Sequence, residues 1–180
     1  MTDLRFTSTE IQLIASLLNH DAVSIIWDIN AFYFNTADTT YKMECLEAQP
    51  EGSDYEFDEV FFCRFEKLAE CGRFDDSEQG YWFKTVVANA KIRSIEVIET
   101  AHVFPDNTLS SIQVHGNGIT HVSLGLVINT DAGIVPAWLL PSRHGFTWLE
   151  KQRVYTSDEV DKWLRYDIKV YNRNLLPRNS

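Results

Sequence analysis

The chain has 180 residues and a formal net charge of −10, which is long enough for one domain with its own core. Hydrophobic residues (44%) and charged residues (23%) stand at values typical of folded proteins, and aromatic residues reach 13%. The acidic balance argues against nonspecific binding to nucleic acid or anionic lipid, because both need a basic surface. We therefore predict neither nucleic acid nor a membrane as partner.

An amphipathic helix is predicted over residues 8–19. Thr7 and Glu10 have the spacing of a capping box, in which each residue bonds to the backbone of the other. Ile11, Ile14 and Leu18 then follow at helical spacing. We expect this apolar stripe to cover one face of a sheet.

Residues 24–35 predict a strand rich in isoleucine and aromatic side chains, with residues 41–47 as its partner. Asp28 then stands among bulky apolar neighbours, where a carboxylate needs a partner or has a raised pKa. We expect Asp28 to lie near a strand end or to bond to the backbone. The alternative is a catalytic base.

The stretch 47–78 holds eleven acidic residues against three basic ones. Within it, residues 55–65 predict a strand with one aromatic face, on which Glu59 is an interruption. The residues of that face are Tyr55, Phe57, Phe61, Cys63 and Phe65. The flanking loops, 50–54 and 73–80, are acidic and rich in turn residues. Such loops commonly keep a sheet edge soluble, and the sharper interpretation is a docking surface for a basic partner.

Further strands are predicted over residues 81–87 and 91–99, with a short one over 110–115. The segment 84–100 also fits a helix, but its β-branched residues favour strand.

A buried hairpin over residues 122–140 is the segment around which the chain is organised. Apolar residues recur with a period of two from Val122 to Ile128, and residues 129–133 predict a turn in which Gly133 takes a positive φ. Pro136 donates no hydrogen bond, which places its strand at a sheet edge or a bulge. A membrane span of about 20 apolar residues is not present here, because the turn interrupts the run.

The charge becomes basic after Pro141, and a second amphipathic helix is predicted to begin near Ser157. Thr156 and Glu159 repeat the capping-box spacing, and Val160 and Leu164 recur at helical intervals. Residues 173–180 are predicted to be a frayed tail. The basic end and the acidic middle are also expected to attract each other within the fold.

No catalytic or metal-binding spacing stands out. The five histidines form no HExxH, HxH or Cys/His pattern, and there is no P-loop or GxGxxG. Cys45, Cys63 and Cys71 are an odd number without CxxC spacing or a secretory leader, which is typical of reduced thiols in a cytoplasmic protein. Cys63 is predicted to be an inert core thiol. We therefore predict no cofactor, no metal and no catalytic residue.

These patterns predict a single α+β domain over residues 1–180, mainly an antiparallel twisted sheet with an N-terminal and a C-terminal amphipathic helix. The predicted function is a protein-binding module, most concretely an acidic immunity or antitoxin-type inhibitor of a basic, nuclease-like toxin. Carboxylates would steer the partner and aromatic side chains would anchor it. The predicted contacts are Glu51, Asp54, Tyr55, Glu56, Asp58, Asp75, Asp76, Glu78 and Tyr81.

Two other interpretations remain open. One is a small-ligand-binding protein or hydrolase, in which Asp28 and either His102 or His121 work in an aromatic pocket. That pocket would be lined by Trp27, Phe32, Phe61, Trp82 or Trp138. The other is a subunit that dimerises through aromatic edges, whereas the inhibitor is expected to be a monomer or a weak homodimer.

Overall fold

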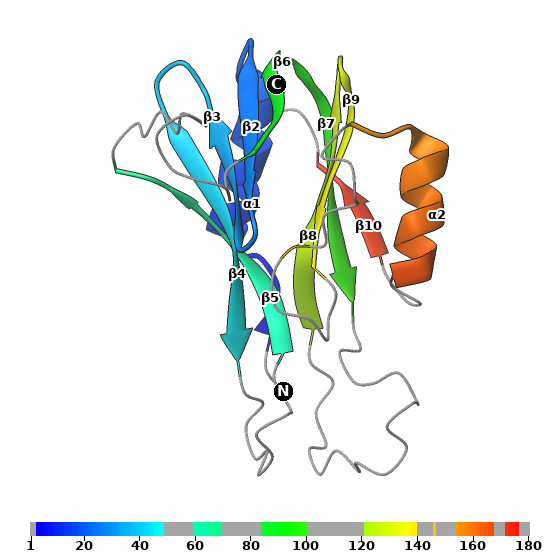
Figure 1. Cartoon of the computed structure of the whole chain (residues 1–180). Helices are drawn as coiled ribbons and strands as arrows, with labels where there is room; N and C mark the ends of the chain where they lie inside the picture. The colour runs from blue at the N-terminus through cyan, green and yellow to red at the C-terminus, as the bar shows by residue number, and fades with distance from the viewer. Residues whose placement is uncertain are drawn as a thin grey trace, which may run out of the picture.

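The structure is a computed structural model that describes residues 3–48, 60–69, 84–100, 121–139, 146, 154–167 and 172–176. Within these residues two sheets face each other, and a helix lies beside one of them (Figure 1). The elements are β1 (Asp3–Leu4), α1 (Ser8–Ser16), the 3-10 helix η1 (Leu17–Asn19), β2 (Val23–Asp28), β3 (Ala31–Asn35), β4 (Thr40–Ala48), β5 (Val60–Lys67), β6 (Lys84–Ala90), β7 (Ile92–Thr100), β8 (His121–Thr130), β9 (Gly133–Trp138), α2 (Ser157–Asp167) and β10 (Asn172–Leu175). Mostly antiparallel strands with helices confirm the predicted α+β class.

The two sheets have five strands each. Sheet A has the order β1-β8-β7-β10, and β9 also pairs with β8. Sheet B has the order β5-β4-β3-β2-β6. The pairing of β1 with β8 is parallel, and the Phe6 N–H beyond β1 donates to Ser123 Oγ of β8 at 2.8 Å. The first residues of the chain are thus fixed to a strand formed much later in the sequence.

The N-terminal helix forms for the reason that its sequence predicts. The Glu10 N–H donates to Thr7 Oγ1 at 3.2 Å, and the Thr7 N–H donates to the Glu10 carboxylate at 2.7 Å. The α-helix ends at Ser16, and residues 17–19 continue as η1. Ile14 and Leu17 are fully buried, so the predicted apolar stripe does face the core.

The single strand predicted over residues 24–35 is wrong, because the structure has the hairpin β2–β3 there. Asp28 pairs with Ala31, which leaves Ile29 and Asn30 as a tight turn. Asn30 is a residue that favours turns, and this local preference outweighs the continuous run of bulky side chains. The predicted partner strand is confirmed as β4.

Residues 84–100 form strands rather than a helix, as the β-branched residues favour. The chain runs through β6 in sheet B and, after Lys91, enters β7 in sheet A. Asn89, just before this crossing, has a positive φ of 52°. The two sheets are therefore linked by one nearly continuous stretch of chain.

The predicted hairpin of residues 122–140 is confirmed as β8–β9. Thr130 pairs with Gly133, which has a φ of +131°, and Asp131 and Ala132 make the turn. Pro136 lies in β9, which lies off the main strand order of sheet A and pairs with β8. Such a position suits proline, because it has no N–H to donate to a second neighbouring strand. Gly125 was not singled out in the sequence, yet its φ of +144° and an irregularity in the β7–β8 register mark a bulge there.

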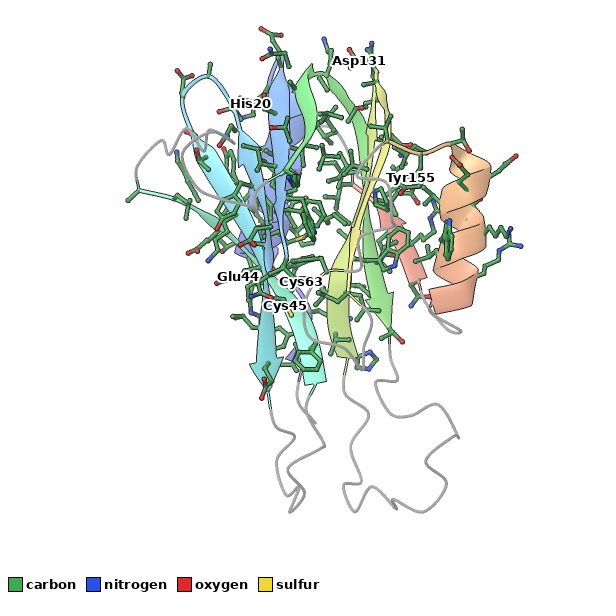
Figure 2. The ribbon with its side chains drawn as sticks, viewed as in Figure 1. His20, Glu44, Cys45, Cys63, Asp131 and Tyr155 are labelled. Carbon is green, nitrogen blue, oxygen red and sulfur yellow. The ribbon has the colours of Figure 1, made fainter. Side chains whose placement is uncertain are left out.

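Two core clusters hold these layers together. The inner cluster lies between the sheets and draws apolar side chains from α1, η1 and the strands β2 to β9. The outer cluster packs β7, β8 and β9 against α2, and Figure 2 shows Tyr155 between sheet A and that helix. Its buried members are Phe62, Ile98, Val122, Leu124, Val127, Trp138, Tyr155, Val160 and Leu164.

The frayed tail predicted over residues 173–180 is wrong for residues 173–176. Asn172–Leu175 forms β10 against β7, and the Leu176 N–H donates to the Ile95 carbonyl oxygen at 2.9 Å. The edge of β7 offers backbone groups that need partners, and this need outweighs the polar composition of the tail. Residues 177–180 and the strand predicted over 110–115 lie outside the described residues.

Candidate functional site

The candidate site predicted from the sequence falls on two acidic segments, residues 49–59 and 70–83. Each predicted contact lies in one of them and outside the described residues: Glu51, Asp54, Tyr55, Glu56 and Asp58 in the first, and Asp75, Asp76, Glu78 and Tyr81 in the second. The structure does describe where these segments are attached. The first joins β4 to β5 and the second joins β5 to β6, so one acidic segment leaves each end of β5.

The inward face of β5 is held in the inner cluster. Phe61, Cys63 and Phe65 are all buried there, which confirms this part of the predicted aromatic face. The rest of the predicted face, over residues 55–59, lies outside the described residues. The Phe65 ring stacks on Tyr41 with centroids 5.8 Å apart and lies 5.7 Å from the Phe34 ring. These contacts fix the strand between the two acidic segments.

A buried carboxylate connects β5 to the N-terminal helix. Glu10 is only 8% exposed, and its carboxylate accepts from the Thr7 N–H in the capping box. Its other oxygen accepts from the Phe65 N–H at 2.9 Å, and the Arg64 guanidinium lies 3.8 Å away. One side chain therefore satisfies backbone donors of two elements far apart in the sequence, so a shift of α1 on β5 would leave the buried carboxylate and the Phe65 N–H without their partners.

Arg64 holds the opposite face of β5 against the start of the chain. Its Nη1 donates to the Arg5 carbonyl oxygen at 2.9 Å and to the Leu4 carbonyl oxygen at 3.4 Å. Its guanidinium also lies over the Phe62 ring, 4.7 Å from the centroid. Arg64 thus connects sheet B to β1 of sheet A.

The outward face of sheet B near β5 carries both signs of charge. Lys42 Nζ bonds to the Glu44 carboxylate, labelled in Figure 2, and lies 4.0 Å from the Glu66 carboxylate. Burial is the largest single influence on the pKa of Lys42 and lowers it, but the hydrogen bond and charge of Glu44, together with the charges of Tyr33 and Glu66, outweigh burial and raise the pKa. Of the eleven acidic residues in 47–78, nine belong to the two undescribed segments, five in 49–59 and four in 70–83. The negative excess is therefore concentrated in those segments.

One cation of the basic end is engaged by acids outside the middle stretch. Arg173 of β10 bonds to both carboxylate oxygens of Glu96, with distances of 2.6 and 2.9 Å, and also to Asp161 of α2. The bonds to Glu96 contribute most to raising the pKa of this guanidinium, even though burial opposes them. Arg173 thus joins β10, β7 and α2, and its charge is shared with those two acids.

The alternative site around Asp28 is not assembled by the described residues. Asp28 ends β2, and its carboxylate accepts from the Ile29 N–H at 2.6 Å, as expected for a carboxylate at a strand end. Phe32 and Phe61 are buried in the inner cluster, whereas Trp138 is buried in the outer one. These aromatic rings therefore belong to two different core clusters.

His121 lies at the start of β8, where it pairs in register with Asp3 of β1. The pKa of Asp3 is lowered to about 2, mainly by its bonds from Arg5. His102 and Trp82, which complete the alternative, lie outside the described residues.

Among the residues that the structure describes, no group of three or more His, Cys, Asp or Glu side chains is placed to hold a metal ion. In the same part of the chain, no helix is both long enough and apolar enough to cross a bilayer.

Comparison with protein-family models, curated proteins and solved structures found no match to this chain.

Sequence reasoning missed the double role of Glu10 and the bonds of Arg64. The capping-box spacing identifies Glu10 as a helix cap, but nothing in that spacing indicates that its second oxygen reaches β5. Alternation along β5 does place Arg64 opposite the aromatic face, which marks it as a residue to examine. Its partners are backbone carbonyl oxygens 59 and 60 positions away in the sequence. Every residue has such an oxygen, so the sequence does not indicate which ones Arg64 will bind.

Proposed function

We propose that this protein is a noncatalytic protein-binding module, specifically an acidic immunity or antitoxin-type inhibitor that blocks a basic, nuclease-like toxin in the cytoplasm. The observation that supports this proposal is the attachment of the two acidic segments to opposite ends of one strand. That strand, β5, is held on one side by the inner cluster and on the other by Arg64.

The size of β5 suits a partner of ordinary dimensions. Eight residues span roughly 25 Å at about 3.3 Å per residue. The two ends of β5, from which the segments leave, are therefore separated by more than the Debye length of about 8 Å at physiological salt. A standard interface buries about 800 Å² on each partner and is wide enough to cover both.

Electrostatic steering explains what such patches contribute. Carboxylates at both ends of a rigid strand accelerate the approach of a Lys/Arg-rich surface and orient it along the strand. Tyr55 and Tyr81 are the proposed desolvated anchors, one in each segment. The engagement of Arg173 by Glu96 and Asp161 supports the proposal, since that cation is already neutralised elsewhere in the molecule.

The test begins with capture of the partner from a lysate of the source organism on the immobilised protein, at low and at high salt. The association rate of the purified partner is then measured with D54S/D58S, with D75S/D76S and with a control, D21S/D38S. Asp21 and Asp38 are exposed and lie outside both segments, so each double variant removes the same charge.

We expect each segment variant to slow association at least several-fold at low salt, and the control to leave it nearly unchanged. The captured partner should be basic, and its cleavage of nucleic acid should stop when the protein is added. Equal rates for all three variants, or a partner without a basic surface, would remove the proposal.

A further inference from the structure

Two cysteines face each other across neighbouring strands of sheet B. Cys45 of β4 and Cys63 of β5 are direct partners in the antiparallel register, and both side chains are buried in the inner cluster. No disulfide joins them. Figure 2 shows the two labelled side chains next to each other, on adjacent strands.

The hydrogen-bond pattern shows which kind of pair they form. The Leu68 N–H donates to the Thr40 carbonyl oxygen at 2.9 Å, so position 40 of β4 bonds toward β5. The β4–β5 register has no shift, and successive residues of a strand direct their backbone N–H and C=O groups to opposite neighbouring strands. The backbone groups of residue 45 therefore point away from β5. The Cys45 N–H does point the other way, since it donates to the Asn30 carbonyl oxygen at 2.9 Å.

Cys45 and Cys63 therefore occupy a non-hydrogen-bonded pair, in which Cα atoms stand about 4.5 Å apart and side chains approach most closely. Disulfides form over Cα separations of roughly 4.4–6.8 Å. The backbone need not move far for the two sulfurs to bond.

We propose that Cys45 and Cys63 are an oxidation site, at which a peroxide converts the facing thiols into a disulfide across β4 and β5. The Cys45 thiolate attacks the peroxide, which leaves Cys45 as a sulfenic acid and releases water after protonation. The Cys63 sulfur then attacks the Cys45 sulfur, the S–O bond breaks, and a second water leaves. The thiols lose two electrons and two protons in total, and the peroxide is reduced to two waters.

The order of these steps follows from burial. Cys45 is 7% exposed and Cys63 is fully buried, so the oxidant reaches Cys45 first. Burial also raises the pKa of the Cys63 thiol, which makes the second step slow in the folded protein. The bond forms on the time scale at which the hairpin opens locally, and a reductant reverses it.

The disulfide would close the hairpin that carries the first acidic segment, because residues 49–59 lie between Cys45 and Cys63. Oxidation would thus restrict the base of that segment. The chemistry itself rests on the register alone and holds whether or not the segment binds a toxin.

The test compares disulfide pairing in the folded and the unfolded wild-type protein. Each is treated with hydrogen peroxide, remaining thiols are blocked, and the linked peptides are identified by mass spectrometry. Residues 63 and 71 are 8 apart and residues 45 and 63 are 18 apart, so the unfolded chain favours the shorter Cys63–Cys71 loop.

We expect the folded protein to give the Cys45–Cys63 peptide instead, with the mass of two hydrogen atoms lost and regained on reduction. The C71S variant, which leaves both core cysteines in place, should give the same product. The proposal is overturned if folded and unfolded protein show the same pairing, if the products are intermolecular, or if Cys45 is overoxidised while Cys63 stays reduced.

Discussion

Gly125 occupies a position in β8 that no other residue can fill without strain. An added Cβ would lie 2.0 Å from the Ala137 carbonyl oxygen and 2.6 Å from the Trp138 Cα, and φ is +144°. Both obstacles are backbone atoms of the paired strand β9. We predict that G125A lowers the free energy of unfolding by at least about 3 kcal/mol, measured by denaturant titration.

Gly133 provides the comparison for this prediction. Its φ is also positive, but an added Cβ would lie 2.7 Å from the Val154 Cγ2 and 2.8 Å from the Val154 Cβ, which is a milder clash than the 2.0 Å approach to backbone at Gly125. G133A should therefore cost less than G125A. Equal losses would mean that backbone strain alone, and not the approach of β9, sets the requirement for glycine.

Cys63 gives stability a dependence on pH at alkaline values. Burial raises the pKa of this thiol in the folded state, so the unfolded chain loses the proton first as pH rises. The contribution is fully present below the unfolded pKa of about 8.5 and is lost above it. We predict that stability under reducing conditions falls by up to about 1.4 kcal/mol per pH unit above that value.

C63A tests this assignment, because alanine removes the ionising group and keeps a small apolar side chain. The variant will be less stable at neutral pH, but its stability should decline less steeply between pH 8.5 and pH 10. A slope identical to that of the wild type would assign the alkaline loss to other groups.

At the scale of elements, Glu10 and Glu159 allow one capping box to be compared with another. Glu10 caps α1 and also accepts from the Phe65 N–H of β5, whereas the Glu159 carboxylate accepts from the Thr156 N–H in an exposed box. Loss of a cap typically costs about 1 kcal/mol. We predict about that cost for E159A and about 2–3 kcal/mol for E10A, which also leaves a buried donor without its acceptor.

Hydrogen exchange locates the effect of these variants. E10A should increase exchange at the Phe65 amide as well as in α1, while E159A should affect only the start of α2. Similar losses of stability for the two variants would show that the bond to β5 contributes little.

Much of the element pattern was predictable from sequence because its signals are local. The capping boxes at Thr7 and Thr156, the period-two run of β8 and the turn before Gly133 each depend on neighbouring residues. The hairpin turn at Asn30 and the strand β10 were not predicted. In the first case, bulky residues continue on both sides of the turn, and in the second a polar segment forms a strand only because the edge of β7 is available.

Of the candidate site, the sequence could predict only which residues it contains and not how they are held in space. Sequence shows the acidic segments and the strand between them, and the structure adds that Arg64 and Glu10 hold that strand to β1 and α1. Such contacts join residues more than fifty positions apart, and no local pattern encodes them. The facing of Cys45 and Cys63 likewise follows from strand register, which the spacing of two cysteines does not reveal.

At the scale of the whole molecule, the net charge of −10 should make stability depend on salt. Like charges repel within the compact fold, and salt screens exposed charges more than partly buried pairs such as Arg173 with Glu96. We predict that raising sodium chloride from about 20 to 200 mM stabilises the protein by about 1 kcal/mol, or roughly 2–4 °C in Tm for a chain of this size.

The double variant D54S/D58S is the control for this effect, because it removes two of the repelling charges. Its Tm should respond less to salt than that of the wild type. A Tm that falls with salt would instead indicate that attraction between the acidic middle and the basic end stabilises the fold.

The bond from Phe6 to Ser123 spans 117 positions of the chain. On the ribosome, the strands β2 to β5 emerge before β8 and can pair as a meander, but Phe6 has no β8 to join until Ser123 has been made. The segment around Phe6 is therefore exposed to proteases and chaperones until β8 emerges. Native docking of these first residues is expected among the last events of folding, after the slow closure of a large loop.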